Sequence, residues 1–230
     1  MMHYYYSPFD ILLLPALILS IWAQLSVSGA FKKYGAVRNS RGITGRETAS
    51  RILSANGIGS VPVLHTGGEL TDNYNPVNNT VNLSDGVYDS ASVAAVGIAA
   101  HECGHAVQHS TGYLPIKIRN AVLPAVQLSS KASMPLFILG LLFSLRPLVT
   151  VGIALFSAAV FFQLVTLPVE FNASARALRT IKDMDILDES EYKGARKVLW
   201  AAAMTYVAAA AMAALQLLRL IAISDNNRRR

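Results

Sequence analysis

The feature that most restricts the fold of this chain is an apolar run, residues 148–167, that contains no charged side chain. A helix that crosses about 30 Å of hydrocarbon needs about 20 mostly apolar residues, and this run supplies them. Residues 9–27 and 198–223 are also apolar enough for spanning helices. Residues 120–145 have a shorter apolar core, 132–145, preceded by Lys131, and are predicted to form a helix that begins outside the bilayer and then crosses it. Composition agrees, because 53% of the residues are hydrophobic and only 15% are charged, against about 25% charged in soluble domains. We therefore predict a mainly α-helical membrane protein with about four transmembrane helices.

The second and third predicted transmembrane helices are expected to form a hairpin over residues 120–167. Arg146 and Pro147 separate the two apolar runs, and proline disfavours helix in the residue before it, so we predict the turn there. Such a hairpin returns residues 168–197 to the side of the membrane that holds residues 30–119. Most of the Lys and Arg residues lie on that side, and positive residues near helix ends favour the cytoplasm. The polar domain is therefore predicted to be cytoplasmic.

The two ends of the chain complete this topology, which places both termini outside. Residues 9–27 are predicted to be an uncleaved anchor. A signal peptide has Lys or Arg before its apolar run, whereas here the basic residues Lys32 and Lys33 come after it. Residues 224–230 form a basic tail. Four arginines oppose the predicted orientation, because they lie on the side of the membrane opposite the polar domain. They are Arg146 and the three arginines of the tail, Arg228, Arg229 and Arg230.

Two polar segments, residues 30–119 and 168–197, are predicted to form one small α+β domain. The second segment continues the third transmembrane helix and ends in an acidic turn before the last apolar run. In the first segment we predict helices at residues 45–56 and 90–108, capped by Thr44 and Ser90, and strand-like pieces at residues 61–64 and 80–83.

The predicted helix over residues 90–108 contains an H-E-x-x-H motif, His101-Glu102-Cys103-Gly104-His105. Residues four apart lie on one face of a helix, so both imidazoles can reach one zinc ion. Glu102 lies beside that face and is the predicted general base that takes a proton from water. Cys103 points away from the ligands and is expected to pack. Gly104 costs a helix about 1 kcal/mol relative to Ala, which predicts that another segment approaches the backbone there. The alternative is a chance match on a core helix.

A catalytic zinc needs a third protein ligand and an open position, and Glu170 is the predicted ligand. It follows a spanning helix directly, where a carboxylate is expensive and usually marks function. The alternative is an interface carboxylate paired with a base such as Arg176. His65 and His109 are further candidate ligands, whose ordinary roles are those of a loop histidine and a polar helix-end residue. Ser174, one turn after Glu170, is predicted to bond a ligand histidine or to be an ordinary polar helix residue.

Several stretches resemble the bacterial membrane-bound neutral zinc metallopeptidase family typified by YugP. They are VNLSDGVY, AAHECGHAVQH and LPVEFNASARAL, with GITGRETASRILSANGI and LTDNYNP nearer the start of the chain. The chain is more distantly similar to the HtpX-type membrane zinc peptidases, which have an acidic residue where this chain has Ser174. The resemblance implies one Zn²⁺ per chain, held by His101, His105 and Glu170, with Glu102 as the catalytic base. It also implies that residues 80–83 form an edge strand that pairs with an extended substrate, in a multi-pass protein of the bacterial cell membrane.

The predicted function is that of an integral membrane zinc endopeptidase of the gluzincin type, acting on membrane proteins or membrane-proximal segments. The partners are the lipid bilayer and a peptide substrate, with a homo-oligomer or a membrane partner left open. Nucleic acid is excluded, because the basic residues flank apolar runs and form no dense patch. The alternatives are a non-proteolytic zinc-binding scaffold or chaperone, and a zinc hydrolase of lipids or esters. The sequence leaves four candidates for stabilising the oxyanion: Tyr74, Tyr88, His109 and Arg176.

Overall fold

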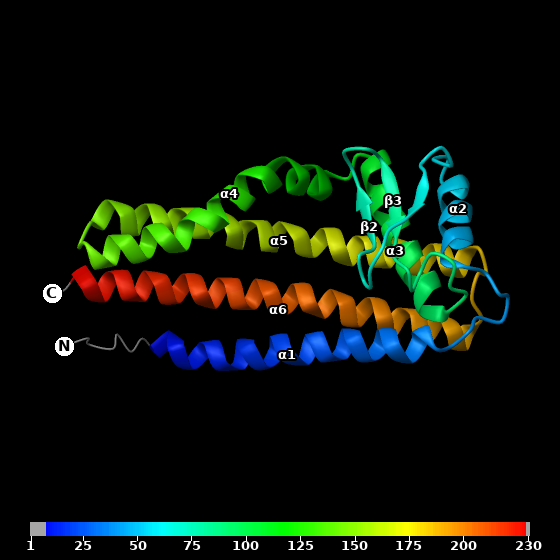
Figure 1. Cartoon of the computed structure of the whole chain (residues 1–230), viewed down its shortest axis with the longest axis horizontal. Helices are drawn as coiled ribbons and strands as arrows, with labels where there is room; N and C mark the ends of the chain where they lie inside the picture. Colours follow the sequence, from blue (N-terminus) through cyan, green and yellow to red (C-terminus); the bar gives the residue numbers. More distant parts are fainter. Residues whose placement is uncertain (1–7, 229–230) are drawn as a thin grey trace. The chain divides into compact units, whose positions relative to one another are not determined.

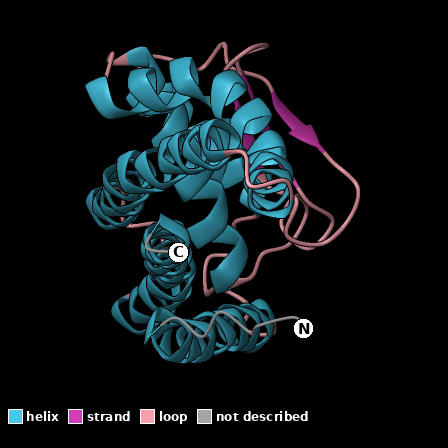
Figure 2. Ribbon diagram, turned by 90° about the vertical axis from the view of Figure 1, so that its left-hand side faces the viewer, coloured by secondary structure: helices cyan, strands magenta, loops and turns pink. Residues whose placement is uncertain are grey.

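The computed structural model describes residues 8–228 of the chain and is mostly helical (Figure 1). Three short strands are the only sheet among the described residues (Figure 2). The helices are α1 (Pro8–Gly35), α2 (Gly45–Ala55), α3 (Val93–Ser110), α4 (Leu114–Leu142), α5 (Arg146–Asp183) and α6 (Glu189–Arg228), and the strands are β1 (Val63–His65), β2 (Asn73–Asn75) and β3 (Thr80–Leu83). Helices α1, α4, α5 and α6 are long and apolar enough to cross a membrane. The predicted fold class, a helical membrane protein with a small α+β domain, is confirmed.

The chain divides into two compact units. The membrane unit contains Ile118–Leu167, the chain up to Trp22 and the chain from Thr205 onward. The peripheral unit contains Ala23–Lys117 and Pro168–Met204. Within the C-terminal basic tail, Arg229 and Arg230 lie outside the described residues, and Arg228 is described only as the last helical residue of α6.

In the membrane unit, α4 and α5 form the predicted hairpin, but the turn lies at residues 143–145. Ser144 has a positive φ of 53°, and α5 begins at Arg146. Pro147 belongs to the first turn of α5, where its missing N–H needs no partner. The two helices pack tightly, because a Cβ on Gly152 would lie 2.9 Å from the carbonyl oxygen of Ser133. The predicted turn at Arg146 and Pro147 was therefore displaced by a few residues, since proline can start a helix as well as end one.

In the peripheral unit, β3 is the central strand of the sheet, in the order β1-β3-β2. Val81 of β3 pairs with Val63 of parallel β1 and with Tyr74 of antiparallel β2. The expectation that residues 80–83 form an edge strand was therefore wrong. The strand β2, which pairs with β3, was not predicted. Its sequence, Asn-Tyr-Asn, resembles a turn because asparagine is rare in strands. The edges of this sheet are β1 and β2.

The helix that carries the H-E-x-x-H motif begins later than predicted, with Ser92 rather than Ser90 as its cap. Ser92 Oγ accepts a hydrogen bond from the backbone N–H of Ala95 at 3.1 Å. A bridge between Arg38 and Ser92 keeps the chain extended at this point, so the helix starts only at Val93. The Ser90 hydroxyl donates instead to Ser92 Oγ at 3.0 Å.

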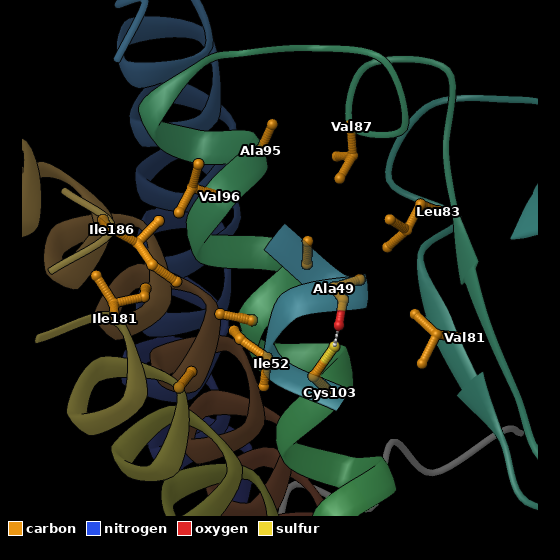
Figure 3. Close-up of a cluster of buried hydrophobic side chains, with 14 of the residues drawn as sticks. Ala49, Ile52, Val81, Leu83, Val87, Ala95, Val96, Cys103, Ile181 and Ile186 are labelled. Atoms are coloured by element: carbon orange, nitrogen blue, oxygen red, sulfur yellow. Dashed lines mark hydrogen bonds between the residues drawn. The ribbon is translucent and has the colours of Figure 1, made fainter. Parts of the chain in front are cut away.

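The core of the peripheral unit surrounds α3 with apolar side chains from α2 and β3 and from the peripheral parts of α5 and α6 (Figure 3). Cys103 is buried in this core, and its thiol donates to the Ala49 carbonyl oxygen at 3.6 Å, as expected for a packing residue. Helix α2, to which Ala49 belongs, begins at the predicted cap, where Thr44 and Glu47 form a reciprocal capping box. These contacts fix α3 relative to α2 and the sheet.

Candidate metal centre

Three side chains from α3 and α5 converge in the peripheral unit: His101, His105 and Glu170. Glu170 Oε2 lies 3.3 Å from His101 Nε2 and 3.5 Å from His105 Nε2. The Glu170 side chain is only 2% exposed, and that of His101 is 15% exposed. The cluster is therefore mostly buried but reaches solvent beside His101.

These separations fit one tetrahedral zinc ion. Two ligand atoms that each lie about 2.0–2.2 Å from zinc at tetrahedral corners are about 3.3–3.6 Å apart. The carboxylate oxygen stands at nearly this distance from both imidazole nitrogens. Two neutral imidazoles and one carboxylate are also the donor types of catalytic zinc sites, and three protein ligands leave one position for water or substrate.

The hydrogen bonds behind His105 determine which of its nitrogens faces the cluster. The Gln108 side-chain amide donates to the Val169 carbonyl oxygen at 2.8 Å, which turns its own oxygen toward His105. That oxygen lies 3.0 Å from His105 Nδ1 and can only accept, so Nδ1 carries the proton. The Nε2 lone pair is then directed at the cluster, as a metal ligand requires.

His101 is held in the same way by Ser174. The Ser174 hydroxyl lies 3.1 Å from His101 Nδ1 and can accept its proton. The predicted contact between Ser174 and a ligand histidine is therefore present. Both histidines have an outer hydrogen-bond partner on Nδ1, an arrangement that orients metal-binding imidazoles.

Gly104 allows α3 and α5 to approach closely enough for the cluster to form. A Cβ at this position would lie 2.7 Å from the Ala173 carbonyl oxygen of α5. Ala173 is on the same helix as Glu170, three residues further on. The absence of a side chain at residue 104 therefore permits the contact that carries Glu170 to the histidines, as the sequence predicted from the cost of glycine in a helix.

Glu102 is buried next to the cluster, with 8% of its surface exposed. Burial raises the pKa of its carboxyl group, the two histidines oppose this, and the charges of Glu170 and Asp72 add to it. At His105, burial would lower the pKa, but the hydrogen bond to Glu170 and the Glu102 charge outweigh it and raise the pKa. The carboxylates and imidazoles of the site are therefore close enough to influence one another electrostatically.

The other candidate residues lie outside this ligand set. His65 Nε2 is 2.7 Å from Asp85 Oδ1 on the surface, and the ring of Tyr88 packs against His65 edge-on. His109 Nδ1 is 2.5 Å from the hydroxyl of Tyr74. Arg176 donates from Nε to Asn172 Oδ1 at 2.8 Å, and Glu170 faces the two histidines instead. Gln108 was missed, because no sequence motif marks an outer partner of a ligand.

The membrane helices, the H-E-x-x-H helix and the neighbouring carboxylate together define the class of membrane zinc metallopeptidases. The chain belongs to one family within that class, since the model described as "Putative neutral zinc metallopeptidase" matches residues 9–225. It is similar to the "Putative membrane protease YugP" of Bacillus subtilis (strain 168), with 47% identity over 220 residues that cover 96% of this chain and 98% of that protein. No solved structure matches the chain. The cofactor of this family is zinc, and the described donor set fits it.

Proposed function

We propose that this protein is a membrane zinc endopeptidase of the gluzincin type, with His101, His105 and Glu170 as the zinc ligands. The observation that carries the proposal is the convergence of two imidazole nitrogens and one carboxylate oxygen beside the buried Glu102. A zinc site with a purely structural role has no use for a general base. The retained glutamate therefore favours hydrolysis over a binding role.

The proposed mechanism assigns separate tasks to the protein groups. When bound, zinc supplies Lewis-acid activation of the scissile carbonyl and of water. Glu102 accepts a proton from the attacking water and delivers it to the leaving amine. Gln108 and Ser174 hold the two imidazoles in the required tautomer through Nδ1.

Tyr74 and His109 are the proposed oxyanion-stabilising pair. His109 lies one turn beyond His105 on α3, so it extends the ligand face of that helix. The Tyr74 hydroxyl is 2.7 Å from Asn79 Oδ1, which can only accept, so the hydroxyl donates there and accepts from His109 Nδ1. Burial raises the pKa of Tyr74 and keeps the phenol protonated. The His109 ring is thereby fixed, and it stabilises an oxyanion as an imidazolium, in which Nδ1–H donates to Tyr74 and Nε2–H donates to the developing negative charge.

The sheet edge at β2 is the proposed docking site for an extended substrate. Strand β2 pairs only with β3 in this sheet, and Tyr74 at its centre contacts His109 of α3. An extended peptide can add to such an edge through backbone hydrogen bonds, which a lipid or an ester lacks. This edge therefore favours a peptide substrate over a lipid, and we propose that the substrates are membrane proteins or membrane-proximal segments.

The proposed orientation places the peripheral unit in the cytoplasm of a bacterial cell. Most Lys and Arg residues lie in the segments that form this unit. Positive residues near the ends of spanning helices favour the cytoplasmic side.

Cleavage of an unfolded protein by the purified, zinc-loaded chain in detergent tests the function. We expect the wild type to cut and Glu102→Gln to lose about 10²-fold or more of kcat, because the amide cannot take up the proton. Zinc content measured on both proteins should be equal, since Glu102 is not a ligand. Equal cleavage by both would exclude Glu102 as the base. Zinc binding without cleavage by the wild type on soluble and membrane substrates would contradict the peptidase function and favour a scaffold.

A further inference from the structure

A second candidate site lies in the membrane unit, in a cavity of about 520 Å³ between α4 and α5. Its polar lining consists of Gln127, Ser130, Lys131 and Gln163, and Val126 and Phe162 contribute apolar walls. This volume falls within the range of about 300–1,000 Å³ typical of small-molecule sites. The cavity therefore combines hydrogen-bond donors and one cation with an apolar surface.

Lys131 has no acidic neighbour in this cavity. No Asp or Glu occurs in the sequence between Glu102 and Glu170, so the part of the α4–α5 hairpin in the membrane unit, Ile118–Leu167, lacks a carboxylate. Among the described residues, no carboxylate lines the cavity. Arg146 provides a contrast, because it lines a different cavity together with Asp225. A charge within a spanning helix is expensive and usually has a partner, and none of the residues that line this cavity supplies one for Lys131.

The position of Lys131 along α4 indicates where such a partner lies. Lys131 is eleven residues before the end of α4 at Leu142, roughly 17 Å at 1.5 Å per residue. In a hydrocarbon core of about 30 Å, this is past the midplane, in the half nearer the start of α4. Helical side chains tilt toward the helix N-terminus, so the ammonium group is directed toward the headgroups of that leaflet.

We propose that this cavity binds the phosphate of an anionic phospholipid. The Lys131 ammonium supplies the charge, and the Ser130 hydroxyl and the amides of Gln127 and Gln163 supply further donors. Val126 and Phe162 contact the first acyl methylenes of the same lipid. Charge complementarity selects a lipid with net negative charge, because a zwitterionic headgroup leaves the ammonium uncompensated. Basic pockets between transmembrane helices are known to bind such headgroups.

Native mass spectrometry of the full chain in a non-ionic detergent tests this lipid site, with phosphatidylglycerol or phosphatidylcholine as the probe. We expect the wild type to bind phosphatidylglycerol about fivefold more tightly, as one lysine near the membrane surface contributes about 1 kcal/mol. Lys131→Gln should lose this preference, and Lys131→Arg should keep it. Lys182→Gln removes a charge in the last turn of α5, outside the membrane unit, and should have no effect.

Three results would overturn the proposal. The first is equal binding of both lipids by the wild type, and the second is an unchanged preference in Lys131→Gln. The third is displacement of the lipid by an equal concentration of inorganic phosphate, which would mean that the apolar wall contributes nothing. Unchanged zinc content and a single gel-filtration peak for Lys131→Gln establish that this variant is folded, so that its lipid preference can be interpreted.

Discussion

Gln108 on α3 is completely buried, and its side-chain amide makes two hydrogen bonds. Its Nε2 donates to the Val169 carbonyl oxygen of α5, and its Oε1 accepts from His105 Nδ1. Methionine at this position has a similar volume but cannot accept that proton. We expect Gln108→Met to weaken zinc binding about 10–100-fold, because His105 loses the partner that fixes its tautomer. Zinc affinity measured by competition with a chromogenic chelator provides the check. The control is Gln24→Met, which makes the same chemical change on an exposed surface of α1 and should bind zinc like the wild type. Wild-type zinc affinity in Gln108→Met would exclude a role for Gln108 in orienting His105.

Tyr74 and His109 lead to a kinetic prediction that does not involve zinc affinity. If they stabilise the oxyanion, His109→Ala should lower kcat about 10²-fold with little change in KM, because the contact strengthens only in the transition state. Tyr74→Phe should reduce kcat less, since the ring of His109 remains. Tyr88→Phe is the matched control, because Tyr88 packs against His65 and Arg46 instead. A rise in KM alone, or loss of zinc from His109→Ala, would contradict the assignment.

Some residues of this site could be predicted from the sequence alone and others could not. His101, Glu102 and His105 were predictable because helical periodicity fixes their mutual positions. The position of Glu170 after an apolar run indicated a functional carboxylate, and the fold brings this carboxylate to the two histidines. Gln108 could not be predicted, because its role depends on a contact with Val169, 61 residues away in sequence.

At the scale of elements, the contact between α3 and α5 depends on Gly104. An alanine there must displace the Ala173 carbonyl, and we expect Gly104→Ala to destabilise the protein by about 1–3 kcal/mol. The same displacement moves Glu170 away from the histidines, so zinc binding should weaken as well. Thermal unfolding and zinc content check both effects. Gly29→Ala in α1, where an added Cβ meets no atom within 4 Å, should instead keep its zinc and match or exceed the wild-type stability. Normal zinc content in Gly104→Ala would show that the helices tolerate a wider separation.

The elements that the sequence predicted least well are those whose partners are distant. Strand β3 was located at its correct residues, but its central place in the sheet depends on β2, whose asparagines do not resemble a strand. The start of α3 depends on the bridge between Arg38 and Ser92, more than 50 residues apart. The Thr44 cap of α2 was predicted correctly, because the hydrogen bonds that form it join residues only three apart in the sequence, Thr44 and Glu47.

At the scale of the whole molecule, the proposed orientation can be tested by cysteine labelling in intact cells. The native Cys103 does not interfere, because its thiol is buried and burial raises its pKa, which keeps it from reacting. We expect a membrane-impermeant maleimide to label Leu145→Cys, in the turn of the hairpin, but not Glu69→Cys, in an exposed loop of the peripheral unit. Permeabilised cells should show labelling of both variants. The opposite pattern in intact cells would reverse the orientation and leave the active-site proposal unaffected.

The proposed ligand set also orders the events of biosynthesis. The two histidines and Glu170 are separated by a stretch of chain that includes the complete membrane hairpin. A ribosome-bound chain that has exposed only α3 has two ligands, and it gains the third after the hairpin has been synthesised and has folded back. Binding of a metal by all three proposed ligands therefore follows synthesis and folding of the hairpin. A nascent chain that ends before Glu170 therefore lacks the complete centre.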